Sequence, residues 1–200
     1  MSSAPKSQWR SELLAARRAV PDPVRQKESQ QLCGHLAQAV GDADTVCAYV
    51  PMGTEPGTPA MLDVLDGLCG TVLLPVARTG PGGEHLPLLW GRYVPDPLVP
   101  GPFGTREPAG PWLSASAVAT ADVVLVPALA VDRRGVRLGR GGGFYDRSLA
   151  LCGPDIRLVA VVRDGELVDE LPGEPHDVPV THALTPGGGL VRLSGLPKPR

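Results

Sequence analysis

Residues 126–149 read Val126-Pro-Ala-Leu-Ala-Val-Asp-Arg-Arg-Gly-Val-Arg-Leu-Gly-Arg-Gly-Gly-Gly-Phe-Tyr-Asp-Arg-Ser-Leu149. Residues 122–126, which lead into this stretch, are nearly all apolar, so they predict a short strand buried on both faces, and Pro127 ends it. Residues 139–143 hold four glycines interrupted only by Arg140, which predicts a loop. Helix-compatible spacing then resumes over residues 145–151. The stretch therefore predicts a strand, a glycine-rich loop and the start of a helix in succession.

A glycine-rich loop between a strand and a helix predicts a binding site for an anion. Glycines let backbone N–H groups approach phosphate oxygens without a Cβ clash, and a helix N-terminus adds partial positive charge. Arg137 and Arg140 add fixed positive charge at the same place. The loop is not a P-loop, because no Gly-Lys-Ser/Thr closes it, and Phe144 stands where a dinucleotide fingerprint needs its last glycine. On these residues alone, a flexible surface loop is the alternative.

The overall composition indicates a single cytoplasmic domain. The chain has 200 residues, enough for one sizeable core and too few for two comfortable ones. Its formal net charge of −2 argues against wholesale nucleic-acid binding, and no apolar run approaches the length of a membrane span. The four cysteines are scattered without CxxC spacing, as expected of small apolar side chains in a reducing cytoplasm. We therefore expect no nucleic-acid or membrane partner.

The first helix is predicted close to the N-terminus. Pro5 suits its first turn, and Trp9 and Leu13 begin an apolar stripe. Lys6 and Arg10 lie one turn apart on a common face. Composition alone favours a solvated basic face for these two residues.

Beyond this helix, strands alternate with helical segments. The predicted elements are helices over residues 22–40, 58–68 and 145–151, and strands over residues 45–50, 71–76, 86–90, 122–126 and 157–162. This alternation predicts an α/β fold, with one layered domain, a mainly parallel central sheet and a helical N-terminus. The domain is expected to cover residues 1–190, and residues 191–200 are expected to form a loose C-terminal tail.

Glu55 stands in the loop that follows the predicted strand at 45–50. A carboxylate just beyond the carboxyl end of a strand is placed as α/β proteins place ligand-binding groups. A solvated loop acid is an equally good interpretation on this residue alone. Farther along, Phe103, Trp90 and Trp112 could line a pocket for an aromatic ring, although core packing is the expected role for any one of them.

The sequence from Pro127 to Asp146 resembles the signature of the 5-formyltetrahydrofolate cyclo-ligase family. That signature is a strand ending in Pro, then an Asp, a Gly, Arg-Leu-Gly-x-Gly-x-Gly, two aromatic residues and an Asp. Its positions here are Pro127, Asp132, Gly135, Arg137-Leu138-Gly139, Gly141, Gly143, Phe144-Tyr145 and Asp146. Further matches extend the resemblance over nearly the whole chain: Lys6 and Arg10, Glu55 and Thr58, Glu107-Pro108, and His176-Asp177. The resemblance implies a cyclo-ligase-like fold, with ATP and a folate in a cleft at the carboxyl ends of the strands.

The activity implied by the resemblance is ATP-dependent closure of 5-formyltetrahydrofolate to 5,10-methenyltetrahydrofolate, with release of ADP and phosphate. The expected cofactors are ATP and Mg²⁺, the expected partner is the small-molecule folate, with or without a polyglutamate tail, and a monomer is expected. Arg140 and Tyr145 are the expected catalytic residues, and Asp146 is the expected metal ligand. The expected nucleotide-binding residues are Lys6, Arg10, Arg137, Leu138, Gly139, Arg140, Gly141, Gly142, Gly143, Phe144 and Tyr145. The expected folate-binding residues are Val50, Glu55, Arg140, Gly141, Gly142, Gly143 and Phe144.

Two positions depart from the family pattern. The family commonly has an Asp that helps to hold magnesium where this chain has Thr181, and Tyr is frequent where this chain has Phe144. These departures keep open an ATP-dependent paralogue that acts on another small molecule. A non-catalytic folate- or nucleotide-binding module is the alternative from another class, but a mere binder needs no aligned clamp for phosphates.

Overall fold

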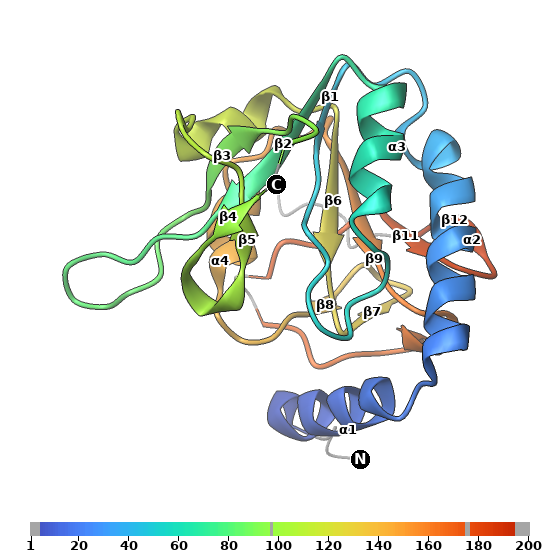
Figure 1. Ribbon diagram of the computed structural model, residues 1–200. Helices are drawn as coiled ribbons and strands as arrows, with labels where there is room; N and C mark the ends of the chain where they lie inside the picture. Colours follow the sequence, from blue (N-terminus) through green and yellow to red (C-terminus); the bar gives the residue numbers. More distant parts are fainter. Residues whose placement is uncertain (1–4, 97, 175–176, 195–200) are drawn as a thin grey trace.

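A seven-stranded sheet runs through the middle of the molecule, in the order β12-β11-β9-β6-β1-β2-β3 (Figure 1). The computed structural model describes residues 5–96, 98–174 and 177–194. The elements are α1 (Lys6–Arg18), α2 (Asp22–Val40), β1 (Thr45–Cys47), α3 (Ala60–Leu68), β2 (Thr71–Val76), β3 (Leu89–Arg92), β4 (Val99–Pro100), η1 (Pro102–Gly104), β5 (Arg106–Glu107), η2 (Ala115–Thr120), β6 (Val123–Pro127), β7 (Ala130–Asp132), β8 (Arg137–Leu138), α4 (Phe144–Leu149), β9 (Arg157–Val161), η3 (Asp164–Glu166), β10 (Leu167–Val168), β11 (His182–Thr185) and β12 (Gly189–Arg192). The five inner strands are parallel, and the edge strands β3 and β12 are antiparallel to their neighbours. This confirms the predicted α/β fold with a mainly parallel sheet.

The two faces of the sheet pack against different helices, and β6 shows how the sequence serves both. Val123 and Leu125 belong to the core under α2 and α3, whereas Val124 and Val126 belong to the core on the side of η2 and α4. Because successive side chains of a strand point to opposite faces, a strand covered on both faces is apolar throughout. Each fully buried side chain of this size contributes roughly 1.5–3 kcal/mol to folding.

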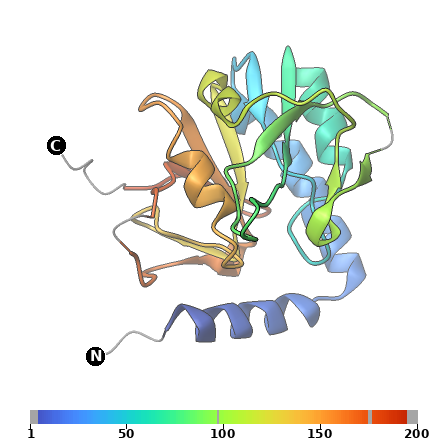
Figure 2. The ribbon, with the colours of Figure 1, turned by 90° about the vertical axis from the view of Figure 1, so that its left-hand side faces the viewer.

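Helix α1 lies apart from these layers, across the end of the sheet at which the inner strands finish (Figures 1 and 2). Its Trp9 and Leu13 pack on a small separate cluster that includes Val136, Leu138 and Leu171. The N-terminal helix therefore has the predicted apolar stripe, but the stripe packs on this small cluster and not on the main core.

Strands β7 and β8, which precede the glycine-rich loop, form a small sheet with β10, in the order β10-β7-β8. The turn between β7 and β8 is organised by Asp132, which is fully buried and accepts hydrogen bonds from the N–H groups of Arg134, Val136 and Leu171. Gly135 in this turn has φ of 93°, and a Cβ there would lie 2.3 Å from a backbone oxygen. These two residues of the matched signature are therefore explained by the fold.

Some boundaries differ from the sequence prediction. Strand β1 ends at Cys47 and not at residue 50, and the strand predicted at 86–90 is Leu89–Arg92. The loose tail predicted from residue 191 is wrong for residues 191–194, because Gly189–Arg192 pairs with β11 and Leu193 is buried. Gly187 and Gly188 lie in the turn before this strand. Residues 195–200 lie outside the described part of the chain, and within that part no helix has the length and apolar character of a membrane span.

Candidate active site

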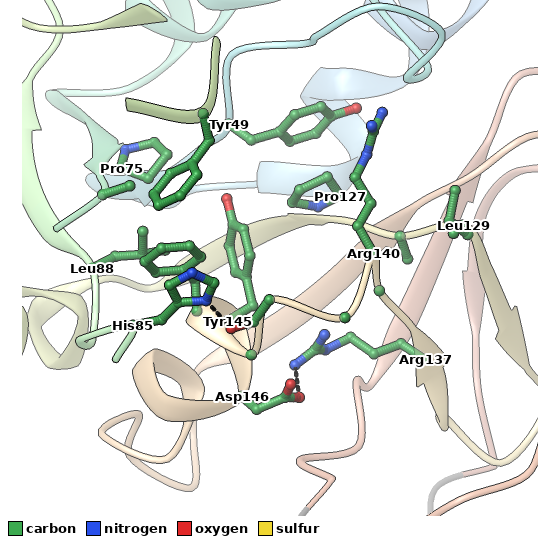
Figure 3. A pocket seen from close by; sticks show the side chains of 18 of the residues that line it. Tyr49, Pro75, His85, Leu88, Pro127, Leu129, Arg137, Arg140, Tyr145 and Asp146 are labelled. Atoms are coloured by element: carbon green, nitrogen blue, oxygen red, sulfur yellow. Dashed lines mark hydrogen bonds and ion pairs between the residues drawn. The ribbon is translucent and has the colours of Figure 1, made fainter. Parts of the chain in front are cut away.

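A cleft of about 910 Å³ opens at the carboxyl ends of the parallel strands, beside α1 (Figure 3). Its walls come from α1, the loop after β1, the ends of β2 and β6, the glycine-rich loop and the start of α4. Every predicted site residue lines it. These residues are Lys6, Arg10, Val50, Glu55, Arg137, Leu138, Gly139, Arg140, Gly141, Gly142, Gly143, Phe144, Tyr145 and Asp146. The fold therefore brings together residues that the sequence places far apart.

Lys6 and Arg10 reach the cleft from one face of α1, because residues four apart are neighbours on a helix surface. The Lys6 ammonium lies 3.0 Å from a carboxylate oxygen of Asp177, and its side chain is 17% exposed. Arg10 donates from Nε to the backbone oxygen of Gly139 at 2.9 Å. Both cations are thus turned toward the cleft, so the solvated basic face that composition favoured is wrong for them.

The glycine-rich loop, residues 139–143, requires glycine at two positions. Gly141 has φ of 98° and Gly143 has φ of 68°, in the left-handed region that glycine adopts readily. A Cβ at Gly143 would also lie 2.5 Å from a guanidinium nitrogen of Arg147. Within the described part of the chain, the amide N–H groups of residues 140–143 donate to no protein acceptor. The loop therefore offers several backbone donors to a ligand.

Glu55 enters the cleft from the loop after β1. One of its carboxylate oxygens accepts from the Met52 N–H at 2.9 Å, and the other accepts from Arg140 Nε at 3.1 Å. Burial raises the pKa of Glu55 above its usual value of 4.5, against the opposing effects of the Met52 amide and the Arg140 guanidinium. The side chain is only 10% exposed, so the solvated loop acid considered from the sequence is wrong. A carboxyl group with a raised pKa in a cleft is typical of a functional site.

Asp146 and Arg137 form an ion pair at the start of α4 (Figure 3). The Arg137 side chain is 4% exposed, and its Nε has no hydrogen-bond partner among the described residues. Asp146 is 31% exposed and lines the cleft, so its carboxylate is accessible to a ligand. Mg²⁺ takes oxygen ligands and commonly uses one or two carboxylates beside substrate phosphates. Asp146 fits that donor set, although the described residues contain no group of three side chains that could hold a metal by themselves.

Tyr145 points from the first turn of α4 into the cleft (Figure 3). Its hydroxyl is buried and has no hydrogen-bond partner within the described residues. Burial raises the Tyr145 pKa far above its usual value, and the nearby Glu55 carboxylate adds to this effect. The hydroxyl therefore stays protonated near neutral pH. A buried donor without a partner is costly, so this hydroxyl is suited to a ligand oxygen.

Several residues that line the cleft are not predicted by the sequence: Arg17, His85, Glu107 and the tail acids Glu174 and Asp177. Arg17 had a usable signal, because it lies seven residues after Arg10 and thus on the same helix face. Glu107 and Asp177 lie in segments that resemble the family, without a role assigned to them. His85 had no signal, because nothing in its Gly- and Pro-rich surroundings marks a single histidine.

Thr181 lies outside the cleft, so the prediction that it stands at the metal is wrong. Its hydroxyl accepts from the Leu158 N–H at 3.1 Å and donates to the Leu158 oxygen at 2.9 Å. Leu158 is near the amino end of β9, which is the opposite end of the sheet from the cleft. The tail carboxylates that line the cleft are Glu174 and Asp177, and His176 lies outside the described residues.

The three aromatic residues considered from the sequence have different places. Phe103 lines the cleft, with its ring in edge contact with His85 and Phe144 at centroid distances of 5.3 and 5.6 Å. Trp90 is 1% exposed and belongs to the core. Trp112 is not part of the cleft wall, and the Arg78 guanidinium lies 4.1 Å above its ring. Only the first of them is thus placed to meet a ligand.

Comparison with known proteins identifies one family over almost the whole chain. A family model described as the 5-formyltetrahydrofolate cyclo-ligase family matches residues 2–186. A 5-formyltetrahydrofolate cyclo-ligase of Mycolicibacterium smegmatis is 55% identical over 193 residues, which cover 96% of this chain and 100% of that protein. The Escherichia coli protein of the same name is 31% identical over 174 residues, covering 85% of this chain and 94% of that protein. The solution structure of Aquifex aeolicus 5,10-methenyltetrahydrofolate synthetase superposes with a TM-score of 0.77 and 25% identity, covering 98% of this chain and 96% of that one.

Proposed function

The chain belongs to the 5-formyltetrahydrofolate cyclo-ligase family, and we infer from this that its cleft carries out the family's reaction. It is a ligase that uses ATP to close 5-formyltetrahydrofolate to 5,10-methenyltetrahydrofolate, with release of ADP and phosphate. The structural observation that supports this conclusion is the meeting of the glycine-rich loop, Lys6, Arg10 and Glu55 in one cleft.

We propose that the phosphates of ATP bind between α1 and the glycine-rich loop. Lys6 and Arg10 approach from the helix, Arg137 and Arg140 approach from the two sides of the loop, and the amides of residues 140–143 supply hydrogen-bond donors. Phosphoryl transfer depends mainly on alignment and on stabilisation of charge. Fixed cations and oriented amides in a partly buried cleft provide both.

The folate binds on the Glu55 side of the cleft. A buried carboxylate needs hydrogen-bond donors, and a pterin ring offers N–H groups of that kind. Val50, at 7% exposure, adds apolar surface where the strand leads into the same loop. Because Glu55 accepts from Arg140 Nε, the folate-binding carboxylate is bonded directly to the phosphate-binding loop. This connection brings the two substrates together at Arg140.

The reaction begins when the formyl oxygen attacks the γ-phosphorus and ADP leaves. N10 of the folate then attacks the activated carbon and gives up its proton. The carbon–oxygen bond breaks to release phosphate, which takes up that proton. Arg140, whose side chain is 47% exposed, is free to turn from Glu55 and stabilise the charge on the phosphoryl group. The protonated Tyr145 hydroxyl donates a hydrogen bond to an oxygen of the reacting groups. No covalent bond between enzyme and substrate is needed.

Mg²⁺ supplies further neutralisation of phosphate charge, and we propose that Asp146 holds it. The family commonly has a metal-binding Asp in the tail, and the sequence match placed that position at Thr181. We propose that Asp177 has this role instead, because it is the tail Asp that lines the cleft. Both carboxylates are paired with cations, Asp146 with Arg137 and Asp177 with Lys6. The ATP phosphates would attract those cations and leave the carboxylates to the metal.

The test is an assay with 5-formyltetrahydrofolate, ATP and Mg²⁺ that follows both the absorbance of the methenyl product and the release of phosphate. We expect the two to appear together in equal amounts. Phosphate release without methenyl product, with other small molecules as better substrates, would favour a paralogous enzyme. Binding of ATP and folate without either product would favour a non-catalytic module.

A further inference from the structure

The glycine-rich loop is held from outside by its backbone carbonyls. Arg10 Nε donates to the oxygen of Gly139 at 2.9 Å, and Arg147 donates to the oxygen of Gly143 at 2.9 Å. Between these two, the oxygen of Gly142 lies 2.6 Å from Nδ1 of His85. A carbonyl oxygen only accepts, so Nδ1 of this histidine carries the hydrogen. Side chains from three separate parts of the chain thus fix carbonyls within one short loop.

A fixed carbonyl also fixes an amide. In a planar trans peptide the C=O of one residue and the N–H of the next point in opposite directions. The short bond from His85 to the Gly142 oxygen, with a longer one of 3.4 Å from Arg147 to the same oxygen, therefore sets the direction of the Gly143 N–H. This N–H has no acceptor within the described residues. This control matters here, because Gly141 and Gly143 adopt left-handed φ values and glycine peptides rotate easily.

We propose that His85 is a positioning residue for the phosphate-binding loop, acting through its hydrogen bond to the Gly142 oxygen. The proposal rests on the proposed function, in which the amides of this loop bind the phosphates of ATP. His85 comes from the loop between β2 and β3, far from the glycine-rich loop in sequence. His85 therefore connects the loop between β2 and β3 to the glycine-rich loop, and it orients the Gly143 N–H as a donor.

The ring of His85 makes a second contact, whose effect has to be distinguished from that of the hydrogen bond to Gly142. It stacks on Phe144 with a centroid distance of 4.2 Å and an angle of 15° between the planes. Stacking could hold the start of α4 in place without any effect on the Gly142 peptide. Two substitutions distinguish these contacts. His85→Phe keeps an aromatic ring for stacking and removes the donor, whereas His85→Asn keeps a donor near the position of Nδ1 and removes the ring.

The full-length protein and both variants are compared by calorimetric titration with ADP and by steady-state kinetics. In His85→Phe we expect the Kd for ADP and the KM for ATP to rise about tenfold, the size of one lost hydrogen bond to a positioned group. The KM for the folate and the thermal midpoint should stay near the wild-type values. In His85→Asn the Kd for ADP should stay within about threefold of wild type, because the donor is retained.

A matched control is available in His35, whose Nε2 lies 3.1 Å from the backbone oxygen of Pro186, outside the cleft wall. His35→Phe and His35→Asn should leave the Kd for ADP unchanged. The proposal is overturned if His85→Phe binds ADP as wild type does, if His85→Asn is impaired as much as His85→Phe, or if the folate KM rises equally. ADP titration needs no turnover, so it tests the loop even if the wild-type protein forms no methenyl product and the proposed function fails.

Discussion

The buried ion pair between Arg17 and Glu166 fastens α1 to the rest of the molecule, and its removal gives a sharp prediction. The Arg17 side chain is 2% exposed and that of Glu166 is 7% exposed. Arg17 donates to both carboxylate oxygens of Glu166, at 2.6 and 2.7 Å, and to the backbone oxygen of Ala128 at 2.6 Å. The pair therefore links the C-terminal half of α1 to the segment after β6 and to η3.

Arg17→Met should destabilise the protein strongly, because it leaves a buried carboxylate without its cation. Within the described part of the chain, Glu166 would retain only the Arg163 N–H, at 2.8 Å, as a hydrogen-bond partner. Removing one member of a buried pair costs about 3–5 kcal/mol, which is a large part of a typical total stability of about 5–15 kcal/mol. The double variant Arg17→Met/Glu166→Leu removes both charges, so it should recover to within about 1–2 kcal/mol of wild type.

The assay is urea unfolding at neutral pH, followed by circular dichroism, with the free energy of unfolding obtained by linear extrapolation. Arg133→Met is the matched control, because Arg133 pairs with Asp169 at 3.2 Å while 63% and 96% of the two side chains are exposed. Its loss should cost no more than about 1 kcal/mol. The reasoning is refuted if Arg17→Met costs as little as the control, or if the double variant is less stable than the single one.

Further predictions concern Glu55, Asp146 and Thr181. Glu55→Gln should raise the KM for the folate much more than that for ATP, measured with each substrate varied in turn. Burial raises the Glu55 pKa above 4.5. As the pH falls, Glu55 is therefore protonated at a higher pH than an ordinary glutamate. The acid limb of kcat/KM for the folate should therefore lie above that of a solvent-exposed glutamate and should be absent in Glu55→Gln. By linkage, a raised pKa in the folded state means that the free energy of unfolding falls as the pH rises from 4.5 through the pKa of folded Glu55. Glu55→Gln should remove this dependence of the unfolding free energy on pH. Asp146→Asn should lower kcat at least about tenfold and raise the Mg²⁺ concentration needed for half-maximal rate, whereas Thr181→Asp should change neither in the same titration.

The fold was predictable where burial imposes a pattern. Strand β6 is apolar throughout because both its faces are covered, and the alternation of strands and helices indicates a parallel sheet. The short strands β7, β8 and β10 were not predicted, because two or three residues are too few to show a period. The tail was misread for a different reason. Its first residues continue a strand that begins at Gly189, after a Pro-Gly-Gly turn, and composition alone does not distinguish such a turn from the start of a loose end.

The site was predictable where a residue type is tied to a local motif. The glycine-rich loop and its arginines could be identified from residues 137–146, and the family match added Lys6, Arg10 and Glu55. His85 was out of reach, because its role depends on a contact between two loops. Thr181 was wrongly assigned to the metal, because the sequence alone does not show at which end of the sheet a tail residue lies. A cytoplasmic location, a monomeric state and a polyglutamate tail on the substrate stay predictions of the sequence.

The charges of the cleft explain why a metal should accompany the nucleotide. Among the residues that the structure describes, the wall has seven cationic side chains and five carboxylates, an excess of two positive charges. Lys6, Arg137 and Arg140 are each paired with a carboxylate, so they are held in place before any ligand arrives. If phosphates attract these cations, the carboxylates lose the opposite charge beside them in a partly buried site, which is unfavourable. A divalent cation held by Asp146 would offset that loss, since it would replace the cation that Asp146 gives up. Arg137 and a divalent cation would therefore serve the Asp146 carboxylate in turn, the first before the phosphates bind and the second together with them.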